Sequence, residues 1–364
     1  MRERVKEGSK ERRNEGTGER SIIPSSPPSP ALVIQTAFLG DVILTTPLLS
    51  VLAERHGPVD VVTTPGAASL LETHPAVGSV IRYDKHGADR GWGGFRALAS
   101  EIRGRRYTTI YLPHRSIRSA ALAMLSGAAE RIGFADSPAA LTYTRRFPRP
   151  GAGHEVDRLL ALAGPGHSTP PVSLGLTVAD YEQADQWLAA HGVDHGFVAL
   201  APGSIWGTKR WPYYPALAAA IARPSVIVGG KDDTALAAAI TAAAPRAVSA
   251  AGALSLRASA ALIHRAAVLI TNDSAPLHLA TAAGTPIVAL FGPTVPEFGF
   301  GPRGSGGIAL GHQGLACRPC SRHGPQTCPL GHHRCMRELS VDTVAAALAA
   351  VASAEEQRAI CPRD

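Results

Sequence analysis

The chain has 364 residues, of which 45% are hydrophobic and 18% are charged, and its formal net charge is +7. This length fits two domains of roughly 100 to 200 residues each. No apolar run approaches the ~18 residues that indicate a membrane-spanning helix, so we expect a soluble protein. The basic charge favours anionic partners, which composition alone leaves open among a phosphorylated substrate, an acidic membrane surface and nucleic acid.

Residues 1–30 contain many charged residues, almost no large apolar ones and a closing Ser/Pro run. This composition predicts a disordered N-terminal extension. The extension lacks the apolar stretch of roughly 7 to 15 residues that a secretory signal requires. We therefore expect the protein to be cytoplasmic.

From residue 31 onward, short apolar or β-branched runs alternate with amphipathic stretches. This alternation predicts strands and helices in turn, and it favours parallel sheets covered on both faces. In the first half we predict strands at 31–35, 59–64, 80–83 and 108–112, and helices at 42–55, 95–103 and 117–125.

Proline and glycine concentrate at residues 164–171, and a polar helix at 181–191 opens a second series. This series predicts strands at 197–200, 226–228, 247–249, 268–271 and 287–290, helices at 215–222, 234–243, 256–265 and 276–283, and a last helix at 341–352. We place two Rossmann-like, doubly wound domains at 31–178 and 179–364, the second including a cysteine-rich segment at 317–335 and the C-terminal helix. The carboxyl ends of their strands are expected to face a common cleft.

The first predicted strand leads directly to Gly40 and Asp41, followed by a helix. The glycine permits a tight turn, and Asp41 would point from the start of the helix into the cleft. An N-cap that stabilises the helix by about 1 kcal/mol is the alternative role for this carboxylate.

The second domain opens with a strand followed by Ser204 and then by Lys209. Small residues, hydroxyls and adjacent cations on a loop at a strand end suit a diphosphate, because backbone N–H groups and the lysine share its charge. A solvent-exposed lysine without a ligand is the alternative.

A second strand end in this domain carries Asp273, Ser274, Ala275 and His278. Ser274 is placed to cap the next helix, whose free N–H groups form an anion site. His278 lies about one turn beyond Ser274, so both should face the same end of the cleft. A histidine hydrogen-bonded within the core is the alternative.

Several motifs are absent from the sequence. No G-x-G-x-x-G follows the first strand and no G-x-x-x-x-G-K-[ST] occurs, which removes the main support for a dinucleotide oxidoreductase or a P-loop NTPase. No aspartate pair is suited to holding a divalent ion on a nucleotide diphosphate. We therefore expect no catalytic metal and no cofactor, with charge neutralisation coming from Lys209 and helix dipoles.

Four segments in order resemble the family 9 glycosyltransferases of GT-B fold: FLGDV with TTPLL at 38–49, KRWP at 209–212, TNDSAPLH at 271–278 and FGPTVPEFG at 291–299. The similarity covers roughly residues 31 to 350. That family includes enzymes that transfer L-glycero-D-manno-heptose with inversion from ADP-heptose to the inner core of lipopolysaccharide. The resemblance implies that Asp41 is the general base, that Lys209 binds the donor phosphates, and that Asp273, Ser274, Ala275 and His278 line the ADP-heptose pocket.

The cysteine-rich segment contains Cys317, Cys320, Cys328 and Cys335, and it resembles a segment of a subset of the type II heptosyltransferases. Its spacing, C-x₂-C-x₇-C-x₆-C, also permits a structural tetrahedral zinc site. The gaps are irregular and histidines compete as ligands, so free thiols in an acceptor-side loop remain the other interpretation.

Other functions remain open, namely a different family 9 sugar transferase, a GT-B-fold nucleotide-sugar epimerase and a silent nucleotide-binding module. An acceptor anchored in lipid implies peripheral contact with the inner face of the inner membrane, and no nucleic acid partner. Basic residues of the first domain would supply this contact. They are Arg103, Arg105, Arg106, Arg115, Arg118, Arg145, Arg146 and Arg149.

Overall fold

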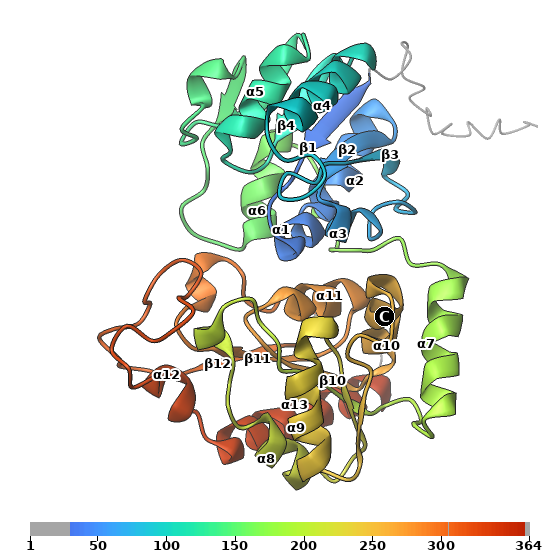
Figure 1. Ribbon diagram of the computed structural model, residues 1–364, viewed down its shortest axis with the longest axis vertical. Helices are drawn as coiled ribbons and strands as arrows, with labels where there is room; N and C mark the ends of the chain where they lie inside the picture. Colours follow the sequence, from blue (N-terminus) through green and yellow to red (C-terminus); the bar gives the residue numbers. More distant parts are fainter. Residues whose placement is uncertain (1–29, 305, 361–364) are drawn as a thin grey trace, which may run out of the picture.

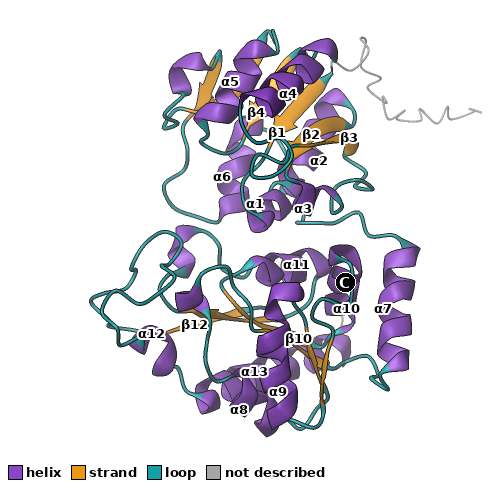
Figure 2. Cartoon of the chain, in the orientation of Figure 1, coloured by secondary structure: helices purple, strands orange, loops and turns teal. Residues whose placement is uncertain are grey.

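The computed structural model describes residues 30–304 and 306–360 of the chain (Figure 1). The extension expected before residue 30 lies outside the described residues. Two lobes follow each other along the chain, and each is built on a six-stranded parallel sheet with helices on both faces (Figure 2). No described helix is both long and apolar enough to cross a bilayer.

The sheet of the first lobe has the strand order β3-β2-β1-β4-β5-β6. All four residues of the central strands β1 and β4 are buried, as expected for strands covered on both faces. The strands are β1 (Ala31–Ile34), β2 (Val59–Thr63), β3 (Val77–Arg82), β4 (Thr109–Leu112), β5 (Glu130–Phe134) and β6 (Arg145–Phe147).

Helices cover the two faces of this sheet with separate apolar clusters. Phe95 of α4 and Leu122 of α5 pack with Leu32 on one face, whereas Leu49 of α2 and Leu159 of α6 pack with the core that contains Val33. The helices are α1 (Leu39–Leu44), α2 (Thr46–His56), α3 (Pro65–Ala68), α4 (Trp92–Gly104), α5 (Ile117–Leu125) and α6 (Glu155–Leu160).

The sheet of the second lobe, β12-β11-β10-β7-β8-β9, repeats the same order when its strands are counted from β7. Its strands are β7 (Val198–Ala201), β8 (Ser225–Ile227), β9 (Ala247–Ser249), β10 (Val268–Asn272), β11 (Ile287–Phe291) and β12 (Ile308–Gly311). Its helices are α7 (Val178–Ala190), α8 (Tyr214–Ala220), α9 (Thr234–Ala243), α10 (Leu256–Arg265), α11 (Ala275–Ala283), α12 (Arg334–Arg337) and α13 (Val341–Ile360). The last helix packs on this second sheet through Val344, Ala347 and Val351.

The two doubly wound sheets confirm the predicted fold class, but several elements differ from the predictions. The single helix expected at 42–55 is two helices that meet at Thr45, whose hydroxyl donates to the carbonyl of Asp41 at 2.7 Å. Strands β5, β6 and β12 and the short helix α6 were not predicted. The domain boundary near residue 178 stays a prediction.

The lobes contact each other in three places. Helix α1 of the first lobe packs against α11 of the second, as Figure 1 shows at the middle of the molecule. The backbone N–H of Glu155 donates to the carbonyl of Gly299 at 2.8 Å, and Arg158 donates to the carbonyl of Phe298. On the far side, Arg257 of α10 donates to the Ser69 carbonyl at 2.8 Å.

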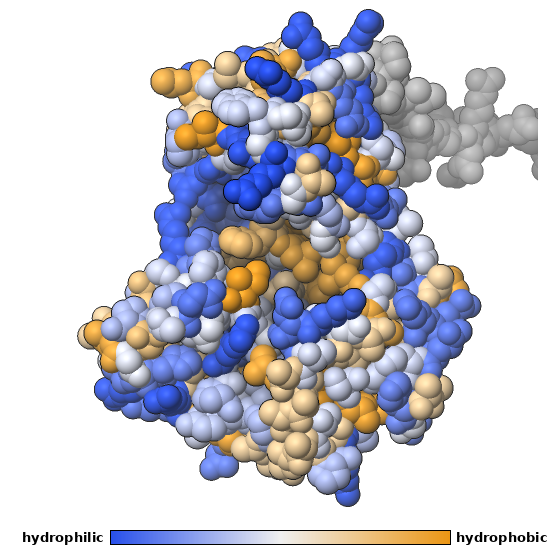
Figure 3. Space-filling view, in the orientation of Figure 1, coloured by the Kyte–Doolittle hydropathy of each residue, from blue (hydrophilic) through white to orange (hydrophobic). Residues whose placement is uncertain are grey.

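Each sheet reverses its strand order at one point, between β1 and β4 in the first lobe and between β7 and β10 in the second. Loops that leave neighbouring strands at such a point run to opposite faces, so a crevice opens at the carboxyl ends of the strands. The surface between the lobes is hollowed, with hydrophilic residues on its upper rim and hydrophobic ones deeper inside (Figure 3). The predicted site residues lie on the loops and helix starts that follow β1, β7 and β10.

Candidate functional site

Asp41 lies in the first turn of α1, directly after β1. It is not the N-cap, because Phe38 occupies that position; instead, its Oδ2 accepts from the Phe38 N–H at 3.1 Å. Burial raises the pKa of Asp41 to about 6, and the negative charge of Glu155 adds to this, whereas the Phe38 N–H and Arg149 oppose it. The carboxyl group is thus ionised at neutral pH but remains a stronger base than an ordinary aspartate.

Glu155, at the start of α6, was not identified from the sequence as part of this environment. Its side chain is buried and accepts from Arg149 at 2.8 and 2.6 Å, and from Arg158 at 3.4 Å. Because α6 is more than a hundred residues from α1 in the chain, no local motif indicated this proximity. The two arginines compensate the charge of Glu155 within a largely buried cluster.

Gly40 allows the two lobes to approach closely beside Asp41. A Cβ atom at residue 40 would lie 2.6 Å from Cδ2 of His278, a distance that forbids any side chain there. His278 itself is 5% exposed and packs against Phe300. The predicted base and the predicted donor-site histidine therefore belong to the same contact between α1 and α11.

The His278 ring is neutral at physiological pH, because burial lowers its pKa to about 4 despite the opposing influence of Asp273. Its Nδ1 atom is buried and has no hydrogen-bond partner among the described residues. A buried nitrogen without a partner is unfavourable. This observation argues against the alternative of a histidine satisfied within the core.

Lys209 ends a short 3₁₀ turn, Gly207–Lys209, and it is buried rather than solvent-exposed. Its Nζ lies 2.5 Å from Oδ2 of Asp273, which also accepts from the Thr294 hydroxyl at 2.6 Å. The structure thus joins the two predicted donor-site loops through an ion pair. Thr294, in the fourth sequence motif, was not singled out as a site residue, although its motif was recognised.

Asn272 connects the same two loops through its side-chain amide. Its Nδ2 donates to the carbonyl of Pro202 at 2.8 Å, while its Oδ1 accepts from the Trp211 N–H at 3.2 Å. The side chain is fully buried. These hydrogen bonds hold the end of β10 against the loop that carries Lys209, so the separation of Lys209 from Asp273 depends on a rigid frame.

Ser204 and Ser274 have their backbones at the predicted positions but bond differently from expectation. Ser204 Oγ accepts from the Trp206 N–H at 3.2 Å. Ser274 occupies the N-cap of α11, yet its side chain makes no capping bond and instead donates to the Asn272 carbonyl at 3.4 Å. The first N–H groups of α11, beginning with Ala275, are therefore not capped by the serine, as an anion site requires.

A group of basic residues lies at the other strand ends of the first lobe. Lys85, after β3, donates from Nζ to the Thr36 carbonyl at 2.7 Å, and Arg118 donates to the Tyr83 hydroxyl at 3.1 Å. Burial and the charge of Arg118 both lower the pKa of Lys85. Neither cation pairs with a carboxylate in the part of the chain that the structure describes. The Arg118 side was suspected from composition, but its partner Lys85 was not.

The four cysteines of the segment 317–335 are free thiols. Cys317 Sγ lies 4.0 Å from His332 Nε2, while Cys335 is buried in the core of the second lobe. Within residues 30–304 and 306–360, no three His, Cys, Asp or Glu side chains are arranged to hold a metal ion. The zinc interpretation stays a prediction, beside that of free thiols.

The same segment contacts the loop that carries Lys209. Thr208 N donates to the Pro325 carbonyl at 3.3 Å, Gly207 N donates to the Gln326 side chain at 3.1 Å, and His333 Nε2 lies 2.8 Å from the Thr208 carbonyl. The segment was expected on the acceptor side. Its hydrogen bonds show that it also supports the donor-side loop.

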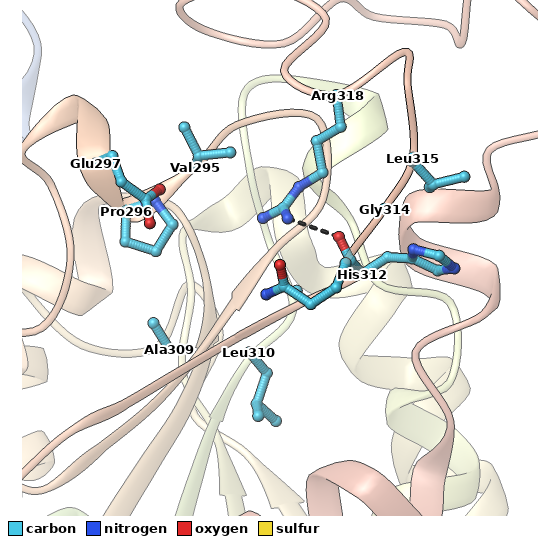
Figure 4. A pocket seen from close by; sticks show the side chains of 11 residues that line it. Val295, Pro296, Glu297, Ala309, Leu310, His312, Gly314, Leu315 and Arg318 are labelled. Atoms are coloured by element: carbon cyan, nitrogen blue, oxygen red, sulfur yellow. Dashed lines mark hydrogen bonds between the residues drawn. The ribbon is translucent and has the colours of Figure 1, made fainter.

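A cavity of about 480 Å³ opens at the carboxyl ends of β11 and β12 (Figure 4). None of the site residues predicted from the sequence lines it. Arg318 points toward it, but the guanidinium is engaged with backbone carbonyls, including that of His312 at 2.7 Å. We therefore regard Arg318 as a structural tie between loops rather than as a ligand-binding group.

Comparison with known proteins gives consistent matches. Lipooligosaccharide heptosyltransferase 2 of Campylobacter jejuni is 42% identical over 78 residues, which is 21% of this chain and only 23% of that protein. Lipopolysaccharide heptosyltransferase 2 of Escherichia coli K12 is 27% identical over 296 residues, covering 73% of this chain and 84% of the relative.

A solved structure, the family 9 glycosyl transferase from Veillonella parvula, superposes with a TM-score of 0.80 at 24% identity and covers 89% of this chain and 97% of its own. This likeness supports the GT-B fold. Residues 95–327, well over half of the chain, match the family model described as glycosyltransferase family 9 (heptosyltransferase). On these grounds the chain belongs to glycosyltransferase family 9.

Proposed function

We propose that the protein transfers L-glycero-D-manno-heptose, with inversion, from ADP-heptose to the inner core of lipopolysaccharide. The observation that carries this proposal is the pairing of two strand-end groups across one contact between the lobes. Asp41, a base with a raised pKa, lies on one side, and the Lys209–Asp273 ion pair lies on the other. The family assignment and the heptosyltransferase names of the relatives support the choice of sugar.

In this proposal, Asp41 accepts the proton of the acceptor hydroxyl as its oxygen attacks the anomeric carbon. The bond between that carbon and the diphosphate breaks on the opposite face, and ADP leaves with the electron pair. Lys209 and the N–H groups at the start of α11 stabilise the charge that develops on the leaving diphosphate. Asp273 and Thr294 hold Lys209 in place until the phosphate arrives.

The acceptor would enter from the first lobe, where Lys85 and Arg118 are available for anionic groups on the inner core. Peripheral contact with the inner leaflet would bring the enzyme to this lipid-anchored substrate. The eight arginines considered for that contact are partly engaged already, since Arg105 pairs with Asp60 and Arg115 with Asp136. The membrane contribution is therefore proposed to be weak.

The type II activity is the finer proposal. It rests on the resemblance of the cysteine-rich segment and on relatives named heptosyltransferase 2. A type II enzyme adds its heptose to an acceptor that already carries one heptose, whereas a type I enzyme adds the first. The size of the accepted core distinguishes them.

The deciding experiment incubates the protein with ADP-heptose and a graded series of truncated inner-core acceptors, with mass spectrometry to detect sugar addition. Addition of one heptose to an acceptor that already carries one supports the proposal. Transfer only from other nucleotide sugars would indicate a different sugar transferase of the family. NMR of the product's anomeric centre tests inversion.

A further inference from the structure

Three aromatic side chains gather where the lobes meet, and the mechanism above does not use them. Phe38 lies before α1, Trp206 lies after β7, and His323 lies in the cysteine-rich segment. The ring centroid of His323 is 5.6 Å from that of Phe38 and 6.1 Å from that of Trp206. The imidazole is nearly parallel to the indole, with an interplanar angle of 16°.

These rings are accessible, which is unusual for aromatic residues of this chain. Phe38 is 48% exposed, His323 is exposed and Trp206 is partly exposed. Large rings elsewhere, such as Tyr111 and Phe291, are almost completely buried. A contiguous exposed patch of this kind indicates a surface that a ligand covers.

The position of the rings relates them to both proposed reacting groups. The Phe38 N–H donates to the Asp41 carboxylate, so its ring lies beside the proposed base. Trp206 immediately precedes the turn that carries Lys209. The three rings thus span the place where the acceptor must lie if its hydroxyl is to reach both Asp41 and the donor.

The backbone around His323 and Trp206 is held firmly. Gln326 Nε2 donates to the Ile205 carbonyl at 2.9 Å, which adds to the hydrogen bonds from Gly207 and Thr208 described above. Gly324, which follows His323, has φ of +81°, and a Cβ there would lie 2.9 Å from Pro293. Rings on such a frame lose little conformational freedom when a ligand stacks on them.

The chemistry of the patch fits an uncharged ring better than a phosphate. Burial lowers the pKa of His323, and the charges of Lys209 and Arg322 lower it further, so the imidazole is neutral at physiological pH. The C–H-bearing face of a pyranose is a suitable partner for such aromatic faces. A nucleobase also stacks on aromatic rings, but a nucleotide bound by the second lobe would have no need of Phe38.

We propose that Phe38, Trp206 and His323 form a stacking platform for the acceptor sugar that receives the glycosyl group. This inference rests on the proposed function, because it assumes that Asp41 acts on the acceptor. The cysteine-rich segment then has a definite task, which is to present His323 and brace Trp206.

The test is steady-state kinetics of Trp206→Ala and His323→Ala with donor and acceptor varied separately. We expect the acceptor KM to rise about tenfold for each variant, equivalent to about 1.4 kcal/mol. The donor KM and kcat should stay within about twofold, as for loss of binding that is equal in ground and transition states. Trp206→Phe should recover most of the acceptor affinity, and Trp92→Ala, which removes a 78% exposed indole from α4, should change nothing.

Weaker ADP binding with an unchanged acceptor KM would overturn the platform in favour of a nucleobase site. Unchanged values for both substrates would reduce the rings to a structural contact. If the wild-type protein transfers no heptose, the proposed function fails, and calorimetry then judges the platform separately. Truncated core oligosaccharides should bind the wild type about tenfold more tightly than Trp206→Ala; equal or absent binding would refute the platform.

Discussion

The two lobes share one strand order, but the groups at their switch points have opposite electrostatic character. In the first lobe, Asp41 is partly buried without a cation in direct contact, and a second carboxylate, Glu155, raises its pKa further. In the second lobe, Asp273 lies 2.5 Å from a buried lysine. The same architecture thus produces a proton acceptor on one side and a compensated ion pair on the other.

This difference teaches that the fold supplies the crevice, whereas individual side chains determine what each edge can do. An uncompensated carboxylate is suited to taking a proton. A lysine whose charge is balanced in the free protein is suited to exchanging its aspartate for a phosphate. The predictions below test the two edges separately, from the largest expected effect to the smallest.

Removing the base should have the largest effect. We expect Asp41→Asn to lower kcat by about 10²- to 10⁴-fold, because a general base contributes on this order. The affinity for ADP should stay within a few-fold, as measured by calorimetry. A parallel loss of ADP binding would mean that Asp41 shapes the donor site and that the two edges are not independent.

Removing the cation should break the other edge. We expect Lys209→Ala to weaken ADP binding by roughly 10- to 150-fold, because a charge-assisted hydrogen bond contributes about 1.5 to 3 kcal/mol. It should also lower Tm, since Asp273 keeps a buried charge without its partner. Arg210→Ala removes the neighbouring exposed cation and serves as the control; equal ADP affinities in the two variants would exclude Lys209 from the site.

The pH dependence should reflect the raised pKa of Asp41. The rate should fall as the pH drops below about 6, because protonation removes the base. Glu155→Gln should move this acid limb to lower pH, since it deletes a negative charge near Asp41 and leaves Arg149 to favour ionisation. Glu72→Gln, on the exposed surface, is the matched control, and an identical shift there would remove Glu155 from the explanation.

Stability should respond to the same group with the opposite sign. A carboxyl group whose pKa is raised in the folded protein stabilises the fold at low pH, and this contribution is lost as the pH rises through about 6. Asp41→Asn should therefore raise Tm at pH 8 and have little effect near pH 4. Thermal denaturation at the two pH values measures this, and a lower Tm for the variant at pH 8 would contradict the assigned cause of the shift.

Membrane contact should show the smallest effect. Binding to anionic vesicles should be detectable by cosedimentation at low salt and should fade toward ~0.5 M NaCl, where screening acts over a few ångströms. Arg103→Ala or Arg106→Ala should each weaken it by on the order of 1 kcal/mol at most. Equal cosedimentation with neutral vesicles would assign the basic surface of the first lobe to the acceptor alone.

The sequence predicted those elements whose apolar pattern is strong. Strands such as β1, β4 and β10 consist of consecutive buried residues, so a short apolar run identified them. Strand β6 has only three residues, and two are arginines exposed at the edge of the sheet. No local pattern distinguishes such a strand from a charged loop.

The same limit applies to the site. Asp41 and Lys209 follow predicted strands and belong to recognisable motifs, so they could be named in advance. Their environment could not be named, because Glu155, Thr294 and His323 are brought to them from distant parts of the chain. Propensity and spacing describe neighbours in sequence, whereas a raised pKa or a shared hydrogen bond arises from neighbours in space.

Gly40 has a consequence for the timing of the reaction. Because His278 occupies the space where a Cβ would lie, the separation of the lobes beside Asp41 is set by a single missing carbon atom. Substituting alanine would act as a fixed spacer that prevents the last fraction of an ångström of closure. Such an enzyme would still bind each substrate in its own lobe, yet it would rarely reach the geometry in which the two can react.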